Sequence, residues 1–155
     1  MFNLTTILTP EHVVLDVEAH SKRSLLLDLA GRLSGDEGEA RLIYQALMER
    51  ERLGSTGVGK GVAIPHAAIP GLDGLVALFA RVRPAIEFDA VDDGPVDLVF
   101  LLLAPETGGS DHLKALARVA RLLHTPETAD RLRHLQDPAE VYAILAGRQS
   151  SSHAA

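Results

Sequence analysis

The fold of this chain is best predicted from residues 50–67, which read RERLGSTGVGKGVAIPHA. Four glycines between residues 54 and 61 make regular structure unfavourable there and predict a close backbone turn. Val62–Ile64 follows as a short apolar strand, which Pro65 should end because proline has no N–H for the hydrogen-bond ladder. His66 comes directly after that strand. Ligands of α/β sheets gather at strand ends, so His66 is the first candidate for a functional residue.

Upstream of this stretch, the sequence predicts one strand and two helices. Val13–Val17 has the β-branched content of a strand, and Ser21 can cap a helix that ends near Ser34. A second helix is expected over about residues 37–51. The apolar residues at helical spacing are Leu25, Leu26, Leu29, Ala30 and Leu33 in the first helix, and Ala40, Ile43, Tyr44, Leu47 and Met48 in the second.

Downstream, two further strands are expected. Val76–Val82 is apolar and is followed by Pro84, which marks its end. Val96–Leu103 is nearly continuous apolar sequence, which is typical of a strand that is covered on both faces. This second strand should therefore lie at the centre of the sheet.

Three more helices complete the predicted pattern. Ser110 or Asp111 can cap the first of them. Thr125 and Asp137, each followed by proline, carry the start signal of two others, and the last helix should stop at Gly147. Strands and helices interleave, so the sequence predicts a single α/β domain with a mixed sheet and helices on both faces. We expect this domain to span residues 1–147 and residues 148–155 to form a flexible tail.

Composition excludes several classes of protein. Hydrophobic residues make up 46% of the chain, which is enough for a core and excludes disorder for most of it. The net charge is 15 − 21 = −6 and only 4% of residues are aromatic, so nucleic-acid binding is not expected. Cysteine is absent, which removes thiolate metal sites and cysteine nucleophiles. No apolar run approaches the ~20 residues of a membrane span, and the simplest expectation is a cytoplasmic protein without membrane insertion.

The glycine-rich segment nearly matches a nucleotide-binding loop. Gly54–Lys60 fits GxxxxGK, but Gly61 stands where a hydroxyl residue would hold magnesium. The context is also reversed, because this segment follows a helix and enters a strand. Nucleotide binding is therefore disfavoured, and the glycines either make a tight connection or bring backbone amides to an anion.

His66, His112 and Arg50 each have two interpretations. A loop histidine is usually just solvated, yet a neutral imidazole with one nitrogen held by an acceptor is a competent nucleophile. His112 falls in the first turn of a helix, where amides face an anion and the neutral imidazole is favoured. Arg50 is one of several cations at a helix end, or else a planar donor for phosphoryl oxygens. The residues alone leave these alternatives open, and no His and carboxylate spacing indicates a metal site.

The segment of residues 50–67 resembles the active-site signature of the enzyme IIA (EIIA) domains of the fructose and mannitol class of the bacterial phosphotransferase system (PTS). The resemblance continues through FDAVDDGPVDLVFLLLAP, residues 88–105, and DHLKALARVARLL, residues 111–123. It is strongest to the nitrogen-regulatory EIIA proteins and covers about residues 4–145. Ala67 is a small departure, because relatives often carry glycine there.

This resemblance implies a roughly five-stranded sheet and a histidine phosphocarrier that needs no cofactor or metal. His66 matches the phospho-accepting histidine, His112 the second active-site histidine and Arg50 the nearby arginine. We expect the phosphoryl group to come from an HPr-like phosphocarrier protein and to influence a regulatory target or pass to a IIB component. The residues that we expect to bind the phosphoryl group are Ser55, Thr56, Gly57, Gly59 and Gly61. The alternatives are a sugar-specific EIIA, a docking module with a vestigial site, and a nucleotide binder.

Overall fold

The computed structural model describes residues 4–107 and 109–147, so the expected tail at 148–155 lies outside the described residues. Strands and helices interleave, as the sequence predicts, but in groups: one strand, two helices, five strands and three helices follow the two short 3-10 helices among the described residues. The elements are the 3-10 helices η1 (Leu4–Thr6) and η2 (Pro10–His12), β1 (Val13–Val17), α1 (Lys22–Leu33), α2 (Glu37–Leu53), β2 (Gly57–Gly59), β3 (Val62–Ala63), β4 (His66–Ile69), β5 (Val76–Ile86), β6 (Val96–Pro105), α3 (Gly109–His124), α4 (Pro126–His134) and α5 (Pro138–Leu145).

The sheet is mixed and has β6 at its centre. Its order is β1-β5-β6-β3-β2, and β4 also pairs with β6. Strands β3 and β4 occupy one line beside β6, because Val62 lies opposite Leu98 and His66 lies opposite Leu102. Six strands therefore fill five positions across the sheet. The expectation of a mixed, roughly five-stranded sheet with a central Val96–Leu103 strand is confirmed.

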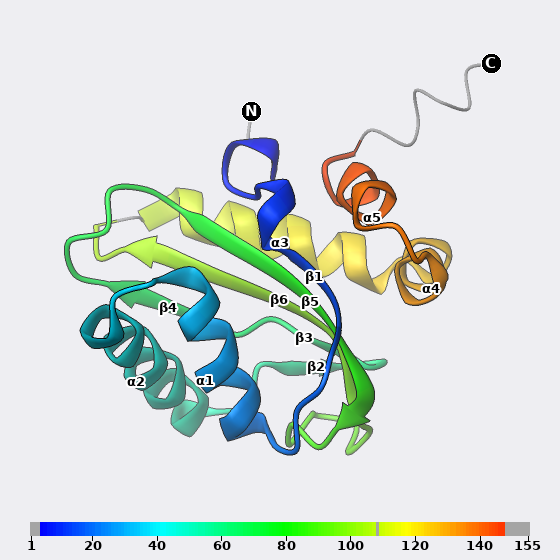
Figure 1. Cartoon of the computed structure of the whole chain (residues 1–155), viewed down its shortest axis with the longest axis horizontal. Coiled ribbons are helices and arrows are strands. Elements are labelled where there is room, and N and C mark those ends of the chain that lie inside the picture. The colour runs from blue at the N-terminus through cyan, green and yellow to red at the C-terminus, as the bar shows by residue number, and fades with distance from the viewer. Residues whose placement is uncertain (1–3, 108, 148–155) are drawn as a thin grey trace.

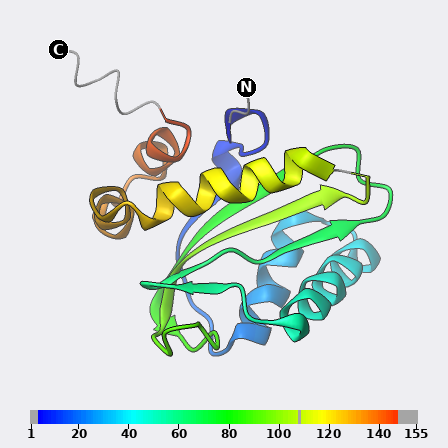
Figure 2. The same cartoon turned by 180° about the vertical axis from the view of Figure 1, so that it is seen from behind.

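Helices cover both faces of the sheet. In Figure 1, α1 and α2 lie in front of it, and the reverse view in Figure 2 shows α3 in front, with α4 and α5 beside one end of α3. Side chains alternate along the central strands, as the pleat requires. In β6, Leu101 packs in the core under α1 and α2, and its neighbour Phe100 packs in the core under α3 to α5. Each face of the sheet thus has its own hydrophobic core.

The helix starts follow only some of the predicted capping residues. Thr125 occupies the N-cap position of α4, but its hydroxyl donates to the carbonyl of Arg121 and makes no capping bond. Ser21 accepts a hydrogen bond from the backbone of Ser24, and Asp137 accepts one from Ala139. The prediction that Ser110 or Asp111 caps α3 is wrong. That helix already begins at Gly109, so both residues lie inside its first turn. The carboxylate of Asp111 there faces the positive end of the helix.

The glycine-rich segment contains more regular structure than its composition suggests. Gly57–Gly59 forms the short strand β2, which pairs antiparallel with β3. The connection between them is the two-residue turn Lys60–Gly61, in which both residues have positive φ values of 59° and 79°. Such a turn matches the twist of a hairpin, and glycine accepts this conformation without strain. The segment is therefore a tight β-hairpin rather than an irregular loop.

Proline ends one of the two strands where the sequence suggested. Strand β3 stops at Ala63, before Pro65, and a separate strand, β4, begins at His66 on the same side of β6. Proline lacks only the donor, so the carbonyl of Pro65 still accepts a hydrogen bond of 2.9 Å from Leu102. By contrast, β5 continues through Pro84 to Ile86, where its pairing with β6 is irregular between residues 81 and 86. His66 is thus the first residue of a strand, not a loop residue.

Candidate functional site

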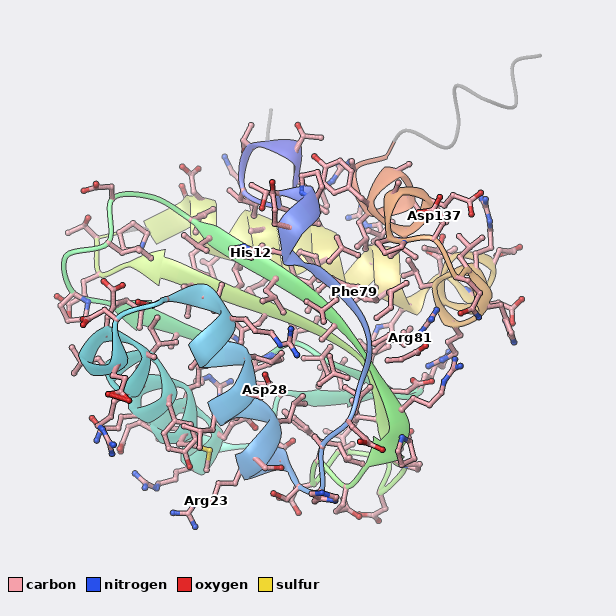
Figure 3. The ribbon with its side chains drawn as sticks, in the orientation of Figure 1. His12, Arg23, Asp28, Phe79, Arg81 and Asp137 are labelled. Atoms are coloured by element: carbon pink, nitrogen blue, oxygen red, sulfur yellow. The ribbon has the colours of Figure 1, made fainter. Side chains whose placement is uncertain are left out.

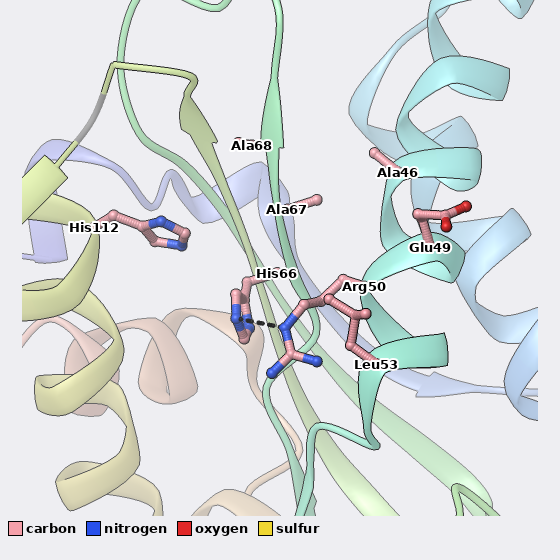
Figure 4. Close-up of a pocket in the computed structure, with 8 residues that line it drawn as sticks. All are labelled: Ala46, Glu49, Arg50, Leu53, His66, Ala67, Ala68 and His112. Carbon is pink, nitrogen blue, oxygen red and sulfur yellow. Dashed lines mark hydrogen bonds between the residues drawn. The ribbon is translucent and has the colours of Figure 1, made fainter.

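His66 is held at both ring nitrogens. Its Nδ1 lies 2.9 Å from the carbonyl oxygen of Ile64, to which an Nδ1–H donates. Nε2 lies 3.3 Å from Nε of Arg50, which donates to it (Figure 4). Because a guanidinium can only donate, this pair of contacts requires the tautomer with its proton on Nδ1. The lone pair of Nε2 is therefore free of a proton and accepts the hydrogen bond from Arg50.

Arg50 reaches the site from the last turn of α2. Its Nη1 donates to the carbonyl oxygen of Gly54 at 2.9 Å, which fixes the guanidinium across the end of the helix. Among the described residues, its Nη2 has no hydrogen-bond partner. The arginine therefore offers a free donor beside the Nε2 atom of His66.

His112 lies on the opposite side of the pocket from Arg50, in the first turn of α3 (Figure 4). Its ring centroid is 5.5 Å from that of His66, and the two planes meet at 73°. Within the described part of the chain, the buried Nε2 of His112 has no hydrogen-bond partner. An unpartnered buried polar atom is costly, so this nitrogen marks a place where a ligand can be bound. The structure thus brings together the three residues that the sequence singled out.

Both histidines are held in the neutral state. Burial lowers the pKa of His66 below its usual 6.5, and the positive charge of Arg50 lowers it further, while the bond to Ile64 and the charge of Glu51 act in the opposite direction. Burial also lowers the pKa of His112, with a smaller contribution from His66. The neutral imidazole is the form that can act as a nucleophile, so the site keeps His66 reactive near neutral pH.

The two histidines and Arg50 line an open pocket of about 360 Å³. Apart from Arg50, its wall from α2 was not identified from the sequence, although Ala46, Arg50 and Leu53 recur at the helical spacing of four and three residues. Leu53, which also lines the pocket, is 82% exposed. The complete lining is Ala46, Glu49, Arg50, Leu53, His66, Ala67, Ala68 and His112.

The residues of the glycine-rich hairpin do not line this pocket. The hydroxyl of Ser55 donates to the carbonyl of Phe88, and it accepts from the backbone of Gly57. The backbone N–H and the hydroxyl of Thr56 both donate to Glu51. Ser55, Thr56, Gly57, Gly59 and Gly61 are thus not among the residues that line the pocket with His66, and the backbone amides of Thr56 and Gly57 are already bonded within the protein.

Two of these glycines are explained by close packing. A Cβ atom on Gly57 would lie 2.9 Å from the backbone of Ala90. On Gly61, which also has positive φ, a Cβ would lie 2.5 Å from the guanidinium of Arg133. Real Cβ atoms do not approach so closely, so glycine is needed for the hairpin to pack. Of the two interpretations left open by the sequence, the tight connection is the one that these contacts support.

Glu51 is a buried charge that the sequence did not reveal. Its side chain is only 2% exposed and lies 2.8 Å from Nζ of Lys22. Lys22 in turn lies 4.8 Å from the centre of the Phe88 ring. With the two donors of Thr56, the carboxylate is fully partnered, which is the condition for burying a charge. This cluster ties the end of α2, and so Arg50, to the hairpin.

Taken together, the arrangement is suited to group transfer. A neutral nitrogen nucleophile faces an open pocket, and donors from Arg50 and His112 flank it. Among the described residues no group of three or more His, Cys, Asp or Glu is placed to hold a metal ion. None of the described helices has both the length and the apolar character that a membrane crossing needs. The fold and the site define a class of small α/β proteins with a histidine at a strand end.

The family follows from comparison with known proteins. Residues 6–147 match the family model for the phosphoenolpyruvate-dependent sugar phosphotransferase system, EIIA 2. The chain therefore belongs to this PTS EIIA family, as the signature of residues 50–67 indicated. Members of this system pass phosphoryl groups between proteins.

Three relatives illustrate the similarity. A nitrogen regulatory protein from Bradyrhizobium diazoefficiens is 45% identical over 144 residues, which cover 92% of this chain and 94% of the relative. A PTS system fructose-specific EIIA component from Haloferax volcanii is 37% identical over 150 residues, covering 93% and 95% of the two chains. The crystal structure of the nitrogen regulatory protein IIA-Ntr from Neisseria meningitidis has a TM-score of 0.87 at 36% identity, covering 92% of this chain and 98% of that one.

Proposed function

We propose that this protein is a nitrogen-regulatory EIIA that accepts a phosphoryl group on Nε2 of His66 from an HPr-like phosphocarrier protein. The observation that carries the proposal is the hydrogen bonding of the His66 ring. Its Nδ1 is committed to the backbone, so Nε2 is the nitrogen with an available lone pair. Similarity to nitrogen regulatory proteins over most of the chain supports the regulatory assignment.

The proposed transfer is an in-line displacement between two histidines. Nε2 of His66 forms a bond to phosphorus as the bond from phosphorus to the donor histidine breaks. The leaving nitrogen keeps the bonding electron pair, and the proton of His66 stays on Nδ1, bonded to Ile64. Phosphoryl transfer of this kind depends on position and on stabilisation of oxygen charge. The carbonyl of Ile64 positions the ring for it.

Arg50 and His112 supply that stabilisation. In the unphosphorylated protein Nε of Arg50 donates to Nε2 of His66, so the guanidinium must shift before this nitrogen can attack. A short shift places its donors on the oxygens of the incoming group, where a planar guanidinium binds well. Nε2 of His112 faces the same space without a partner and would donate to another oxygen. Each contact forms only when the phosphoryl group is present.

Phosphorylation would change the charge of this surface strongly. A phosphoryl group adds about −1.5 to −2 charges, if the value for hydroxyl phosphates holds for histidine. It would stand in a pocket whose rim exposes Leu53, a side chain suited to contact with another protein. A partner that binds this rim would therefore distinguish the two states. This is the proposed basis of the regulatory output.

The test is the intact mass of the protein after incubation with phosphoenolpyruvate, enzyme I and an HPr-like carrier at non-acidic pH. We expect one phosphate on the wild type and none on His66→Ala. His134→Ala is the matched control, because His134 is exposed on α4 and should leave the labelling unchanged. Equal labelling of wild type and His66→Ala would refute the proposal. No labelling of wild type by several active donors would favour the docking module with a vestigial site.

A sugar-specific EIIA is the second candidate, because the relative from Haloferax volcanii is named a fructose-specific component. This function would use the same His66 chemistry and differ only in the acceptor. Phosphorylated protein mixed with a fructose-type or mannitol-type IIB component distinguishes the two. Rapid loss of the label to the IIB component would favour sugar transport over the regulatory role.

A further inference from the structure

A second surface depression lies between α1 and α2, on the far side of α2 from most of the His66 pocket. Its volume is about 690 Å³, and a neighbouring depression of about 520 Å³ shares Arg23, Arg41 and Tyr44 with it. We call the two together the α1–α2 groove. Its first part is lined by Arg23, Arg41, Tyr44, Gln45, Met48, Glu49 and Arg52.

The groove carries unpaired positive charge in a protein of net charge −6. The one carboxylate that lines its first part, Glu49, is already 2.6 Å from Arg52. Nε of Arg23 donates to the hydroxyl of Tyr44 at 3.0 Å, which orients the guanidinium without neutralising it. Within the described residues Arg41 has neither an ion pair nor a side-chain hydrogen bond. Two guanidiniums therefore flank Tyr44 without an ion pair among the described residues, and the one carboxylate that lines the second part of the groove is Glu37, one helical turn from Arg41.

The shape of the groove suits an extended segment rather than a compact anion. Beyond Arg23 and Arg41 it continues past Gly31 and Gly38, where the missing side chains leave the space between the helices open. Leu27, which is 55% exposed, lines this second part. Arg23 and Arg41, which line both parts, and the exposed Leu27 in the second part match a peptide that carries both acidic and apolar residues. Figure 3 shows Arg23 extending outward from the α1 side of the molecule, where such a peptide can reach it.

We propose that the α1–α2 groove binds an acidic segment of a partner protein. We assign the occupant to another molecule, since residues 1–3 and 148–155 contain no Asp or Glu that could supply the acidic segment. The groove also adjoins the His66 pocket, since Glu49 lines both. A partner seated in the groove would thus lie beside the histidine. Binding to the groove does not require that His66 be phosphorylated, so this proposal can fail without affecting the proposed function.

The test is fluorescence anisotropy of the full chain with a labelled peptide of glutamates interspersed with leucines. A second peptide, with glutamine in place of every glutamate, is the neutral probe. We expect the acidic peptide to bind at least about tenfold more tightly than the neutral one, and added salt to weaken it. The double variant Arg23→Glu with Arg41→Glu should lose at least about tenfold in affinity. Arg32→Glu with Arg118→Glu has the same net charge, alters exposed residues outside the groove and should bind like wild type.

Several outcomes would overturn the proposal. Equal affinity for both peptides would show that charge is not recognised. An equal loss in the two double variants would mean that only the overall charge matters. Competition of inorganic phosphate with the peptide at similar concentration would indicate a small-anion site instead. Self-association that only the Arg23 and Arg41 changes abolish, measured by sedimentation, would assign the groove to a second copy of this chain. Thermal unfolding of every variant checks that each is folded.

Discussion

Arg50 and Glu51 are neighbours in sequence but belong to two different regions of the molecule. Arg50 lies in the His66 pocket, where its Nη2 has no partner among the described residues and Nε2 of His112 has none either. Glu51 lies in the interior, where Lys22 and Thr56 use both of its oxygens. The comparison teaches that two adjacent residues of one helix can differ in this way: the buried Glu51 uses both of its oxygens, whereas Arg50 beside the pocket has a donor without a partner among the described residues.

Helix geometry explains how adjacent residues reach such different surroundings. Successive side chains on a helix point about 100° apart, so Glu51 turns toward the core when Arg50 faces the pocket. Burial then decides the chemistry of each one. A charge at 2% exposure must be paired to be tolerated, whereas the half-buried Arg50 keeps contact with the open pocket. Substitutions of Glu51, Arg50 and His66 therefore test this difference between the interior and the pocket.

The largest effect is expected from Glu51→Ala. This change leaves Lys22 without its partner in a nearly buried site and removes the acceptor of both Thr56 donors. We expect the free energy of unfolding to fall by about 3–5 kcal/mol, the usual cost of breaking a buried ion pair. Urea denaturation measures it. Glu49→Ala is the control, because the Glu49 to Arg52 pair is exposed and should contribute less than about 1 kcal/mol. Equal losses in the two variants would contradict the contrast.

The next effect concerns Arg50 and falls on the rate of transfer. Arg50→Ala removes a donor that we propose binds the phosphoryl oxygens, so the rate of phosphorylation of His66 should fall about 10²–10³-fold. The free energy of unfolding should fall by only about 1 kcal/mol, because Arg50 is half-exposed and its hydrogen bonds exchange with water. Quenched-flow phosphorylation and urea denaturation together measure both quantities.

Arg32→Ala is the control for Arg50→Ala. Arg32 lies on the outer surface of α1, and its substitution should change neither the rate of phosphorylation nor the free energy of unfolding. A variant that loses stability but keeps its rate would place Arg50 with the structural residues.

The sequence predicted the layers of the fold because they depend on local patterns. The apolar run Val96–Leu103 required cover on both faces, and β6 is indeed the central strand. The expectations for Pro84 and for the glycine-rich segment were wrong for a different reason. Whether proline ends a strand depends on whether its missing donor was needed, and whether glycines form a hairpin depends on neighbours such as Ala90 and Arg133. Those neighbours are distant in the chain.

The residues of the candidate site were also only partly predictable from local sequence patterns. His66 stood out by its place after a short strand, but its meeting with His112 depends on packing of α3 beside β6, which no local pattern encodes. Arg50 could not be separated from Arg52 by composition, since both are cations at one helix end. Glu51 was missed altogether, because a glutamate among arginines is usually exposed. At the level of sequence, only the resemblance to a family assigned roles to His66, His112 and Arg50.

The smallest effect is a dependence of stability on pH. The pKa of His66 is lowered in the folded protein, first by burial, whereas in the unfolded chain it returns to about 6.5. Below that pH the unfolded chain therefore binds a proton more readily than the folded one. The free energy of unfolding should fall as pH decreases from about 6.5 toward the folded pKa, by at most about 1.4 kcal/mol per pH unit for one group. His66→Gln should remove this contribution, while His112, whose pKa burial also lowers, keeps its own. Urea denaturation between about pH 7 and pH 5 compares the two proteins. Parallel curves would mean that the His66 imidazole takes up a proton as readily in the folded protein as in the unfolded chain. The pocket would then have no more effect on the pKa of His66 than an exposed surface has.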